Sequence, residues 1–253
     1  MHPGIVFLTS TKDRILSGEP SFELYGAAHF GALGVTLALS ILFVKHARHH
    51  REFSRWAPRV LAGFLFSLYP IHVGVHIWEG SLNREIALPC HLCDVAAFLG
   101  GIGLLTRHQR IVELVWFWGL AGTFQGLLTP TLRFTFPSFY YFAFFALHSG
   151  VVITAVYLVA GLGIRPQRGA VWRAFGWIQV YLVIVSLVNW VSGTNYGFLR
   201  AKPPQATLLD FMGPWPWYIV GLEALGLGLF TLLYLPFWKF QRQAAGEGRI
   251  DNR

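Results

Sequence analysis

Long apolar segments separated by short polar ones dominate this chain. A helix needs about 20 mostly apolar residues to cross the hydrocarbon core of a membrane, and only helices or closed barrels satisfy every backbone group there. The apolar runs are long enough for helices. The pattern predicts seven spans, at residues 25–44, 60–78, 89–105, 111–128, 139–162, 171–191 and 215–237, of which the third and fourth are short.

The composition agrees with a chain that has lipid as its solvent. Of 253 residues, 54% are hydrophobic and 13% are charged, and the mean hydropathy is +0.49, far more apolar than a soluble domain of this length. No internal repeat, low-complexity tract or long linker interrupts the chain. We therefore expect an all-α polytopic transmembrane helix bundle that forms a single integral membrane domain over residues 1–253.

The net charge of +8 would suggest nucleic acid as the partner of a soluble protein, but here the basic residues sort by loop. One side holds 14 of the 20: Lys45, Arg48, Arg51, Arg55, Arg59, Arg107, Arg110, Arg165, Arg168, Arg173, Lys239, Arg242, Arg249 and Arg253. The other side holds Lys12, Arg14, Arg84, Arg133, Arg200 and Lys202. The positive-inside rule then predicts an N-terminus outside and a C-terminus in the cytoplasm, and we expect no nucleic-acid partner.

The N-terminal segment carries no sign of a removable signal peptide. No basic stretch precedes a short apolar run and a small-residue cleavage site, so the first span is expected to target the chain itself. These features predict a multi-pass protein of the plasma membrane. Membrane lipids are its expected partners, and no obligatory protein partner is predicted.

Polar residues gather in the outer halves of the predicted spans or just beyond them. They come from all seven spans or the loops beside them, with His148 near mid-membrane: His29, Tyr69, His72, His76, Glu79, Asp94, Gln125, Thr129, His148, Asn189, Thr194, Asn195, Tyr196 and Glu223. Any one of them more often bonds helix to helix than lines a site. Ionisable groups at membrane depth are costly and usually face a bundle interior or a wet cavity, so this clustering predicts an outward-facing pocket.

The only two cysteines, Cys90 and Cys93, lie three residues apart where the third span begins at Pro89. The positive end of a helix lowers the pKa of a nearby thiol and can hold an oxyanion, so either cysteine could act as a nucleophile. An ionised Asp94 would oppose that effect, or it could cap the helix. Cys93, His148 as a base from another span, and His91 are the catalytic candidates.

Several other residues are candidates for substrate binding. His72 and His76 lie one turn apart, a spacing that suits a shared proton, a metal or simple packing. Arg84 and Lys202 lie in outer loops, where they could hold a phosphate headgroup. The aromatic residues at 215–218 are expected to anchor the last span at the interface. The predicted substrate-binding set is His72, His76, Asp94, Gln125, Asn195, Tyr196, Lys202 and Glu223.

Three segments carry a resemblance to a known family. Residues 88–94 read Leu-Pro-Cys-His-Leu-Cys-Asp, residues 195–203 read Asn-Tyr-Gly-Phe-Leu-Arg-Ala-Lys-Pro, and residues 213–218 read Gly-Pro-Trp-Pro-Trp-Tyr. The chain resembles the YwaF-like bacterial membrane proteins over nearly its whole length. That family looks related to eukaryotic acyltransferases that load acyl chains onto lysophospholipids through a cysteine in a similar His-Leu-Cys motif, which implies Cys93 as the nucleophile. Distantly similar lipid-ester hydrolases place a histidine two spans after their nucleophilic threonine, as His148 stands two spans after Cys93.

Four functions stay open from the sequence. The first is acyl transfer between membrane lipids through a thioester on Cys93, with no cofactor and no metal. The second is a metal-dependent lipid hydrolase with ligands among His72, His76, His91, His148 and Asp94. The third is a thiol–disulfide enzyme, although a second cysteine pair is missing. The fourth is a non-enzymatic carrier or receptor with a polar outer cavity.

Overall fold

The computed structural model describes residues 22–203 and 207–247. Within these ranges the regular elements are all helices: α2 (Ala27–His49), α3 (Phe53–Trp78), α4 (Leu92–Thr106), α5 (Gln109–Phe117), η1 (Trp118–Thr123), α6 (Phe124–Leu128), α7 (Phe139–Val156), η2 (Tyr157–Gly161), α8 (Ala170–Ser192), η3 (Tyr196–Phe198), η4 (Leu208–Met212) and α9 (Trp217–Glu247). The prediction of an all-α polytopic bundle is confirmed. Lys12, Arg14, Arg249 and Arg253 lie outside the described residues.

Six helical segments of the described chain are long and apolar enough to cross a membrane. They are Ala27–His49, Phe53–Trp78, Gln109–Leu128, Phe139–Gly161, Ala170–Ser192 and Trp217–Trp238. The prediction of seven was wrong for residues 89–105. The helix there has 15 residues, because the chain is still extended at His91 and the helix begins at Leu92. At 1.5 Å per residue it rises about 22 Å, less than a hydrocarbon core of about 30 Å.

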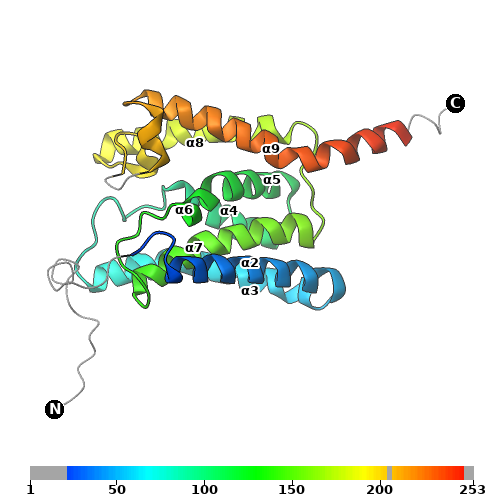
Figure 1. Ribbon diagram of the computed structural model, residues 1–253, viewed down its shortest axis with the longest axis horizontal. Helices are drawn as coiled ribbons and strands as arrows, with labels where there is room; N and C mark the ends of the chain where they lie inside the picture. The colour runs from blue at the N-terminus through cyan, green and yellow to red at the C-terminus, as the bar shows by residue number, and fades with distance from the viewer. Residues whose placement is uncertain (1–21, 204–206, 248–253) are drawn as a thin grey trace, which may run out of the picture.

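The helices form three layers, seen edge-on in Figure 1. The outer layers are α2 with α3 and α8 with α9, and α4, α5, α6 and α7 lie between them. The short α4 still reverses the direction of the chain, since Arg107 at its end donates to the Ser54 carbonyl at the start of α3 at 2.9 Å. The start of α2 and the end of α9 therefore lie at opposite ends of the bundle.

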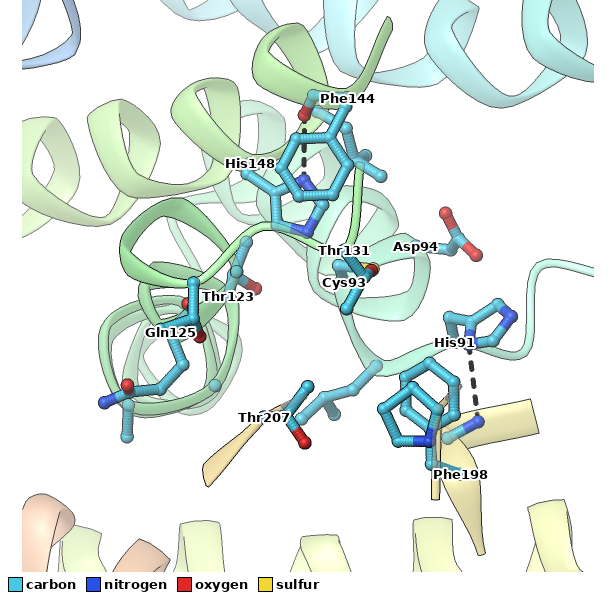
Figure 2. Close-up of a pocket in the computed structure, with 18 of the residues that line it drawn as sticks. His91, Cys93, Asp94, Thr123, Gln125, Thr131, Phe144, His148, Phe198 and Thr207 are labelled. Carbon is cyan, nitrogen blue, oxygen red and sulfur yellow. Dashed lines mark hydrogen bonds between the residues drawn. The ribbon is translucent and has the colours of Figure 1, made fainter. Parts of the chain in front are cut away.

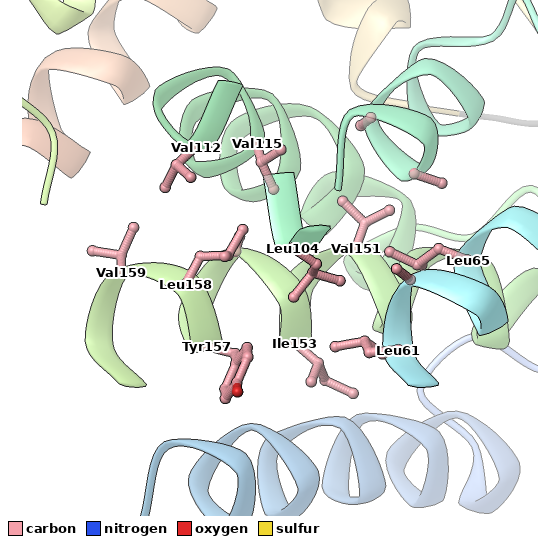
Figure 3. Close-up of a cluster of buried hydrophobic side chains, with 14 residues drawn as sticks. Leu61, Leu65, Leu104, Val112, Val115, Val151, Ile153, Tyr157, Leu158 and Val159 are labelled. Carbon is pink, nitrogen blue, oxygen red and sulfur yellow. The ribbon is translucent and has the colours of Figure 1, made fainter. Parts of the chain in front are cut away.

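The core lies where α3, α4, α5 and α7 meet (Figure 3). Leu65, Leu104, Val115 and Val151 from these helices are almost fully buried there. Glycine lets α4 approach α3 closely: a Cβ at Gly101 would lie 2.5 Å from the Phe66 ring. In a membrane, where lipid removes the hydrophobic driving force between helices, small residues at helix contacts allow close van der Waals packing. Helices α3, α5 and α7 thus pack against α4. The first turn of α4 lies near the end of α3.

Candidate functional site

A cavity of about 820 Å³ lies between the middle layer and the α8–α9 layer, at the end of the bundle where α3 ends and α4 begins. Its walls are mostly apolar, with Phe142 and Leu147 from α7, Phe175 and Ile178 from α8, and Leu222 and Leu229 from α9. Such a cavity has the size and character of a site for a hydrophobic molecule with one polar end. The polar side chains cluster on the wall formed by α4, α6 and α7.

The first turn of α4 supplies two of these polar groups, Cys93 and Asp94 (Figure 2). Cys93 is partly exposed and its thiol is free, and no side chain caps the helix at His91. Cys90 lies before the helix, so the two cysteines do not share a helix face as the sequence predicted. Burial, with the nearby Asp94 carboxylate, raises the pKa of both thiols, against the expectation that either cysteine is activated. Cys93 is the thiol that the cavity wall presents.

His148 lies on α7, in the same polar wall as Cys93 (Figure 2), and is 8% exposed. Its Nδ1 lies 2.8 Å from the carbonyl oxygen of Phe144, and the Phe144 ring stacks on the imidazole with centroids 4.0 Å apart. A carbonyl oxygen only accepts, so Nδ1 must carry the proton in this contact. In the neutral imidazole Nε2 then has a free lone pair, which is the form needed by a general base.

His91 also lines the cavity, but its ring is engaged by the loop after α8. Its Nδ1 accepts from the Gly197 N–H at 3.3 Å, and its ring centroid lies 5.3 Å from that of Tyr196 and 5.9 Å from that of Phe198 (Figure 2). Burial lowers the pKa of His91, which favours the neutral ring that this contact requires. The ring therefore ties the start of α4 to the 196–198 segment.

Two tyrosines hold the rest of the segment that leads into α4. Tyr181 of α8 donates to the Cys90 carbonyl at 2.9 Å. Tyr196 accepts from the Leu88 N–H at 3.0 Å and donates to the Arg84 carbonyl. Because both tyrosines are buried, these bonds are shielded from water. They fix the backbone that places Cys93 in the cavity wall.

Comparisons with known proteins place the chain in a family. The model of the TMEM164 family matches residues 24–234, which include all helices from α2 to η4 and the first part of α9. The chain belongs to the TMEM164 family. An uncharacterized protein of Treponema pallidum (strain Nichols) is 28% identical over 226 residues, which cover 85% of this chain and 90% of that protein. No solved structure matches the chain.

In this TMEM164-family chain, seven of the eleven predicted site residues line the one cavity. They are His72, His91, Cys93, Asp94, Gln125, His148 and Glu223, and they come from α3, the segment before α4, α4, α6, α7 and α9. The structure thus brings together side chains that are up to 151 positions apart in the sequence, from His72 to Glu223. Tyr69, Thr123, Thr131 and Tyr140 line the cavity as well.

The other four predicted site residues lie outside the lining. His76 bonds Ser81 at 2.7 Å across the end of α3. The side chain of Asn195 closes its own turn by accepting from the Arg200 and Ala201 N–H groups. Tyr196 holds the segment before α4, and Lys202 lies 3.9 Å from Asp210 and over the Tyr218 ring. Position along the chain predicts only how deep such a residue lies, whereas the direction of its side chain depends on how the loop folds.

The charged groups of the cavity are all carboxylates: Glu85, Asp94 and Glu223. Among the described residues no lysine or arginine lines it, so Arg84 and Lys202 do not reach its interior. Nor does the described part of the TMEM164-family chain bring together three His, Cys, Asp or Glu side chains able to hold a metal ion. The ligand set suggested for a metal-dependent hydrolase is therefore not assembled among these residues.

Glu113 is a buried acid that was not among the residues predicted from the sequence. It is 1% exposed near the start of α5, where Arg173 of α8 donates to both of its carboxylate oxygens, at 2.9 and 2.8 Å. Gln109 and the Gln167 N–H bond the same carboxylate at 3.2 and 3.0 Å. An acid among arginines at the predicted cytoplasmic end was the available signal. The cluster joins α5 to α8 away from the cavity.

Proposed function

We propose that this chain is a lipid acyltransferase of the plasma membrane that works through a thioester on Cys93 at the outer face. A single observation carries the proposal: a free thiol and a histidine whose Nε2 is left as an acceptor line the same apolar cavity. A nucleophile and a base from two helices on a shared cavity are the parts that covalent acyl transfer requires. The substrates are a diacyl phospholipid as donor and a lysophospholipid as acceptor.

The first half-reaction transfers the acyl chain to sulfur. His148 Nε2 takes the Cys93 proton as the sulfur attacks the ester carbonyl carbon, so no standing thiolate is needed. The N–H groups of Leu92 and Cys93 at the start of α4, which no side chain caps, are available to the oxyanion. The carbon–oxygen bond of the ester then breaks, and the departing glyceryl oxygen takes the proton back from His148. The products are a thioester and a lysolipid.

The second half-reaction uses the same groups in reverse. The hydroxyl of an acceptor lysolipid gives its proton to His148 and attacks the thioester carbonyl carbon. The carbon–sulfur bond breaks, and His148 returns the proton to the Cys93 sulfur. The acyl chain lies against the apolar walls from α7, α8 and α9, and His72, Asp94, Gln125 and Glu223 are placed to bind the polar part of the lipid. Since the cavity holds carboxylates and no cation, the phosphate belongs at the mouth.

Two further points support this assignment. The match between Leu88–Asp94 and the His-Leu-Cys motif of the eukaryotic acyltransferases points to Cys93 rather than Cys90. The positions of the two cysteines favour the same choice, since Cys93 lies in the first turn of α4 and the Cys90 carbonyl is used by Tyr181. A lipid hydroxyl and water compete for the same thioester, so slow hydrolysis is an expected side reaction.

The test is transfer activity in liposomes that contain a labelled diacyl phospholipid and an unlabelled lysophospholipid. We expect Cys93→Ala to abolish transfer and His148→Gln to lower its rate by roughly 100-fold or more, the size of a general-base contribution. Cys90→Ala is the matched control and should retain most activity. Retained transfer in Cys93→Ala, or an equal loss in both cysteine variants, would contradict the proposal.

A further inference from the structure

A second cavity, of about 570 Å³, lies at the other end of the bundle, where α2 and η2 end and α9 passes α5. This is the right-hand end in Figure 1. Its lining combines two arginines, Arg48 and Arg165, with an apolar surface that includes Trp116, Leu162 and Phe237. The residues come from four segments of the chain, so the site is built by the fold rather than by a local run of basic residues.

Arg48 is held in place at this cavity. Its Nε and Nη2 donate to the carbonyl oxygen of Ala160 at 3.0 and 2.8 Å, at the end of the η2 helix. Within the described part of the chain, Nη1 bonds no protein group. Gly161 allows the close approach that this contact needs, since a Cβ there would lie 3.2 Å from the Ala47 Cβ. A guanidinium ordered in this way retains donors for an anion.

The apolar part of the lining is equally well fixed. Trp116 donates through its indole N–H to the Leu233 carbonyl at 3.3 Å, and its ring packs edge-on to Phe237 with centroids 5.7 Å apart. The two aromatic rings thus form an ordered apolar surface beside the arginines. A site with cations at one side and apolar rings at the other matches a molecule with an anionic head and a hydrocarbon tail.

We propose that this cavity binds an anionic phospholipid of the cytoplasmic leaflet. The arginines lie at the end of the bundle that carries most of the basic residues, the end predicted to face the cytoplasm, where anionic lipids are enriched. Phosphate oxygens accept from Arg48 and Arg165, and the acyl chains run along Trp116 and Phe237. The apolar surface favours a lipid over free phosphate. This inference does not depend on the acyltransferase proposal, since the two cavities share no lining residue.

The test is native mass spectrometry of the full chain released from nanodiscs that hold equal amounts of phosphatidylglycerol and phosphatidylcholine with identical acyl chains. We expect the wild type to retain phosphatidylglycerol preferentially. Arg48→Gln combined with Arg165→Gln should lower that preference by about fivefold for each arginine. The control, Arg51→Gln with Arg59→Gln, removes two charges from the same end, outside the cavity, and should keep the preference. Equal losses in both double variants would overturn the proposal.

A measurement on the wild type keeps the proposal testable if the arginine variants fold poorly. Photo-crosslinking with a diazirine phosphatidylglycerol should label peptides that contain Trp116 or residues 159–165. Labelling spread evenly over the bundle would contradict a site here. A further arm adds millimolar inorganic phosphate. Loss of the labelling under phosphate, together with stabilisation of the chain by phosphate alone, would assign the cavity to a free anion instead of a lipid.

Discussion

Gly126 of α6 lies directly against the imidazole of His148 on α7. A Cβ built at Gly126 would lie 2.5 Å from Cδ2 and 2.6 Å from Nε2 of His148, closer than real Cβ contacts allow. The other face of the ring stacks on Phe144, and Nδ1 is bonded to the Phe144 carbonyl. The missing side chain at position 126 therefore fixes where the proposed base presents its lone pair.

Gly126→Ala should displace His148 and lower acyl transfer by roughly 100-fold, because small misplacements of a catalytic group cost that much. Stability should change little, since alanine favours a helix over glycine by about 1 kcal/mol and offsets part of the clash. The measurement is transfer rate together with the thermal unfolding midpoint. Gly34→Ala on α2 is the matched control, because a Cβ there meets nothing within 4 Å. Wild-type activity in Gly126→Ala would show that the position of His148 does not matter.

Glu113→Gln should destabilise the chain by about 3 kcal/mol. The substitution removes the buried carboxylate that Arg173 binds through both of its oxygens and leaves the guanidinium without its counter-charge. Acyl transfer at a temperature where the variant stays folded should be close to wild type, since Glu113 does not line the cavity. Thermal unfolding in detergent measures the first effect. Glu52→Gln removes the exposed partner of Arg55 and should cost less than about 1 kcal/mol. Equal midpoints for the two variants would refute the structural role of Glu113.

Acidification should lower the stability of the folded chain through protonation of His91, which ties the start of α4 to the 196–198 segment. Burial lowers the pKa of this ring in the folded chain, so the unfolded chain binds the proton more readily, and stability falls as pH drops below the unfolded value of about 6.5. Between about pH 7.5 and pH 5.5 the unfolding midpoint of the wild type should fall more than that of His91→Gln. His49→Gln, exposed at the other end of the bundle, should behave as the wild type. An identical acid response in His91→Gln would contradict this account.

Much of the fold was readable from the apolar pattern, since membrane helices must satisfy their backbone bonds internally and so follow length and hydropathy. The span predicted at 171–191 became Ala170–Ser192. The span predicted at 60–78 begins earlier, at Phe53, because the helix continues past the apolar run. The third segment was counted as a span because Pro89, Cys90 and His91 were read as helical. The π-helical turns at 118–123 and 157–161 left no sequence signal.

The sequence predicts candidate site residues on the membrane spans better than those in the outer loops. His72, Cys93 and His148, from three different predicted spans, line one cavity, as expected of ionisable groups at membrane depth, which face a bundle interior or a wet cavity. Side chains in the outer loops, such as Asn195 and Lys202, depend on turns and ring contacts that apolar periodicity does not encode. Their bonds to Arg200 and Asp210 follow from the folded loop alone.

The most direct test of the central claim is mass spectrometry of the purified protein after incubation with a diacyl phospholipid, in the wild type, Cys93→Ala and Cys90→Ala. The thioester mechanism predicts an adduct of one acyl chain in the wild type and in Cys90→Ala, sensitive to hydroxylamine and absent from Cys93→Ala. Addition of a lysophospholipid should remove the adduct as the acyl chain passes to the acceptor. An adduct that persists in Cys93→Ala, or acyl transfer with no adduct on any variant, would contradict the assignment of Cys93 as the nucleophile.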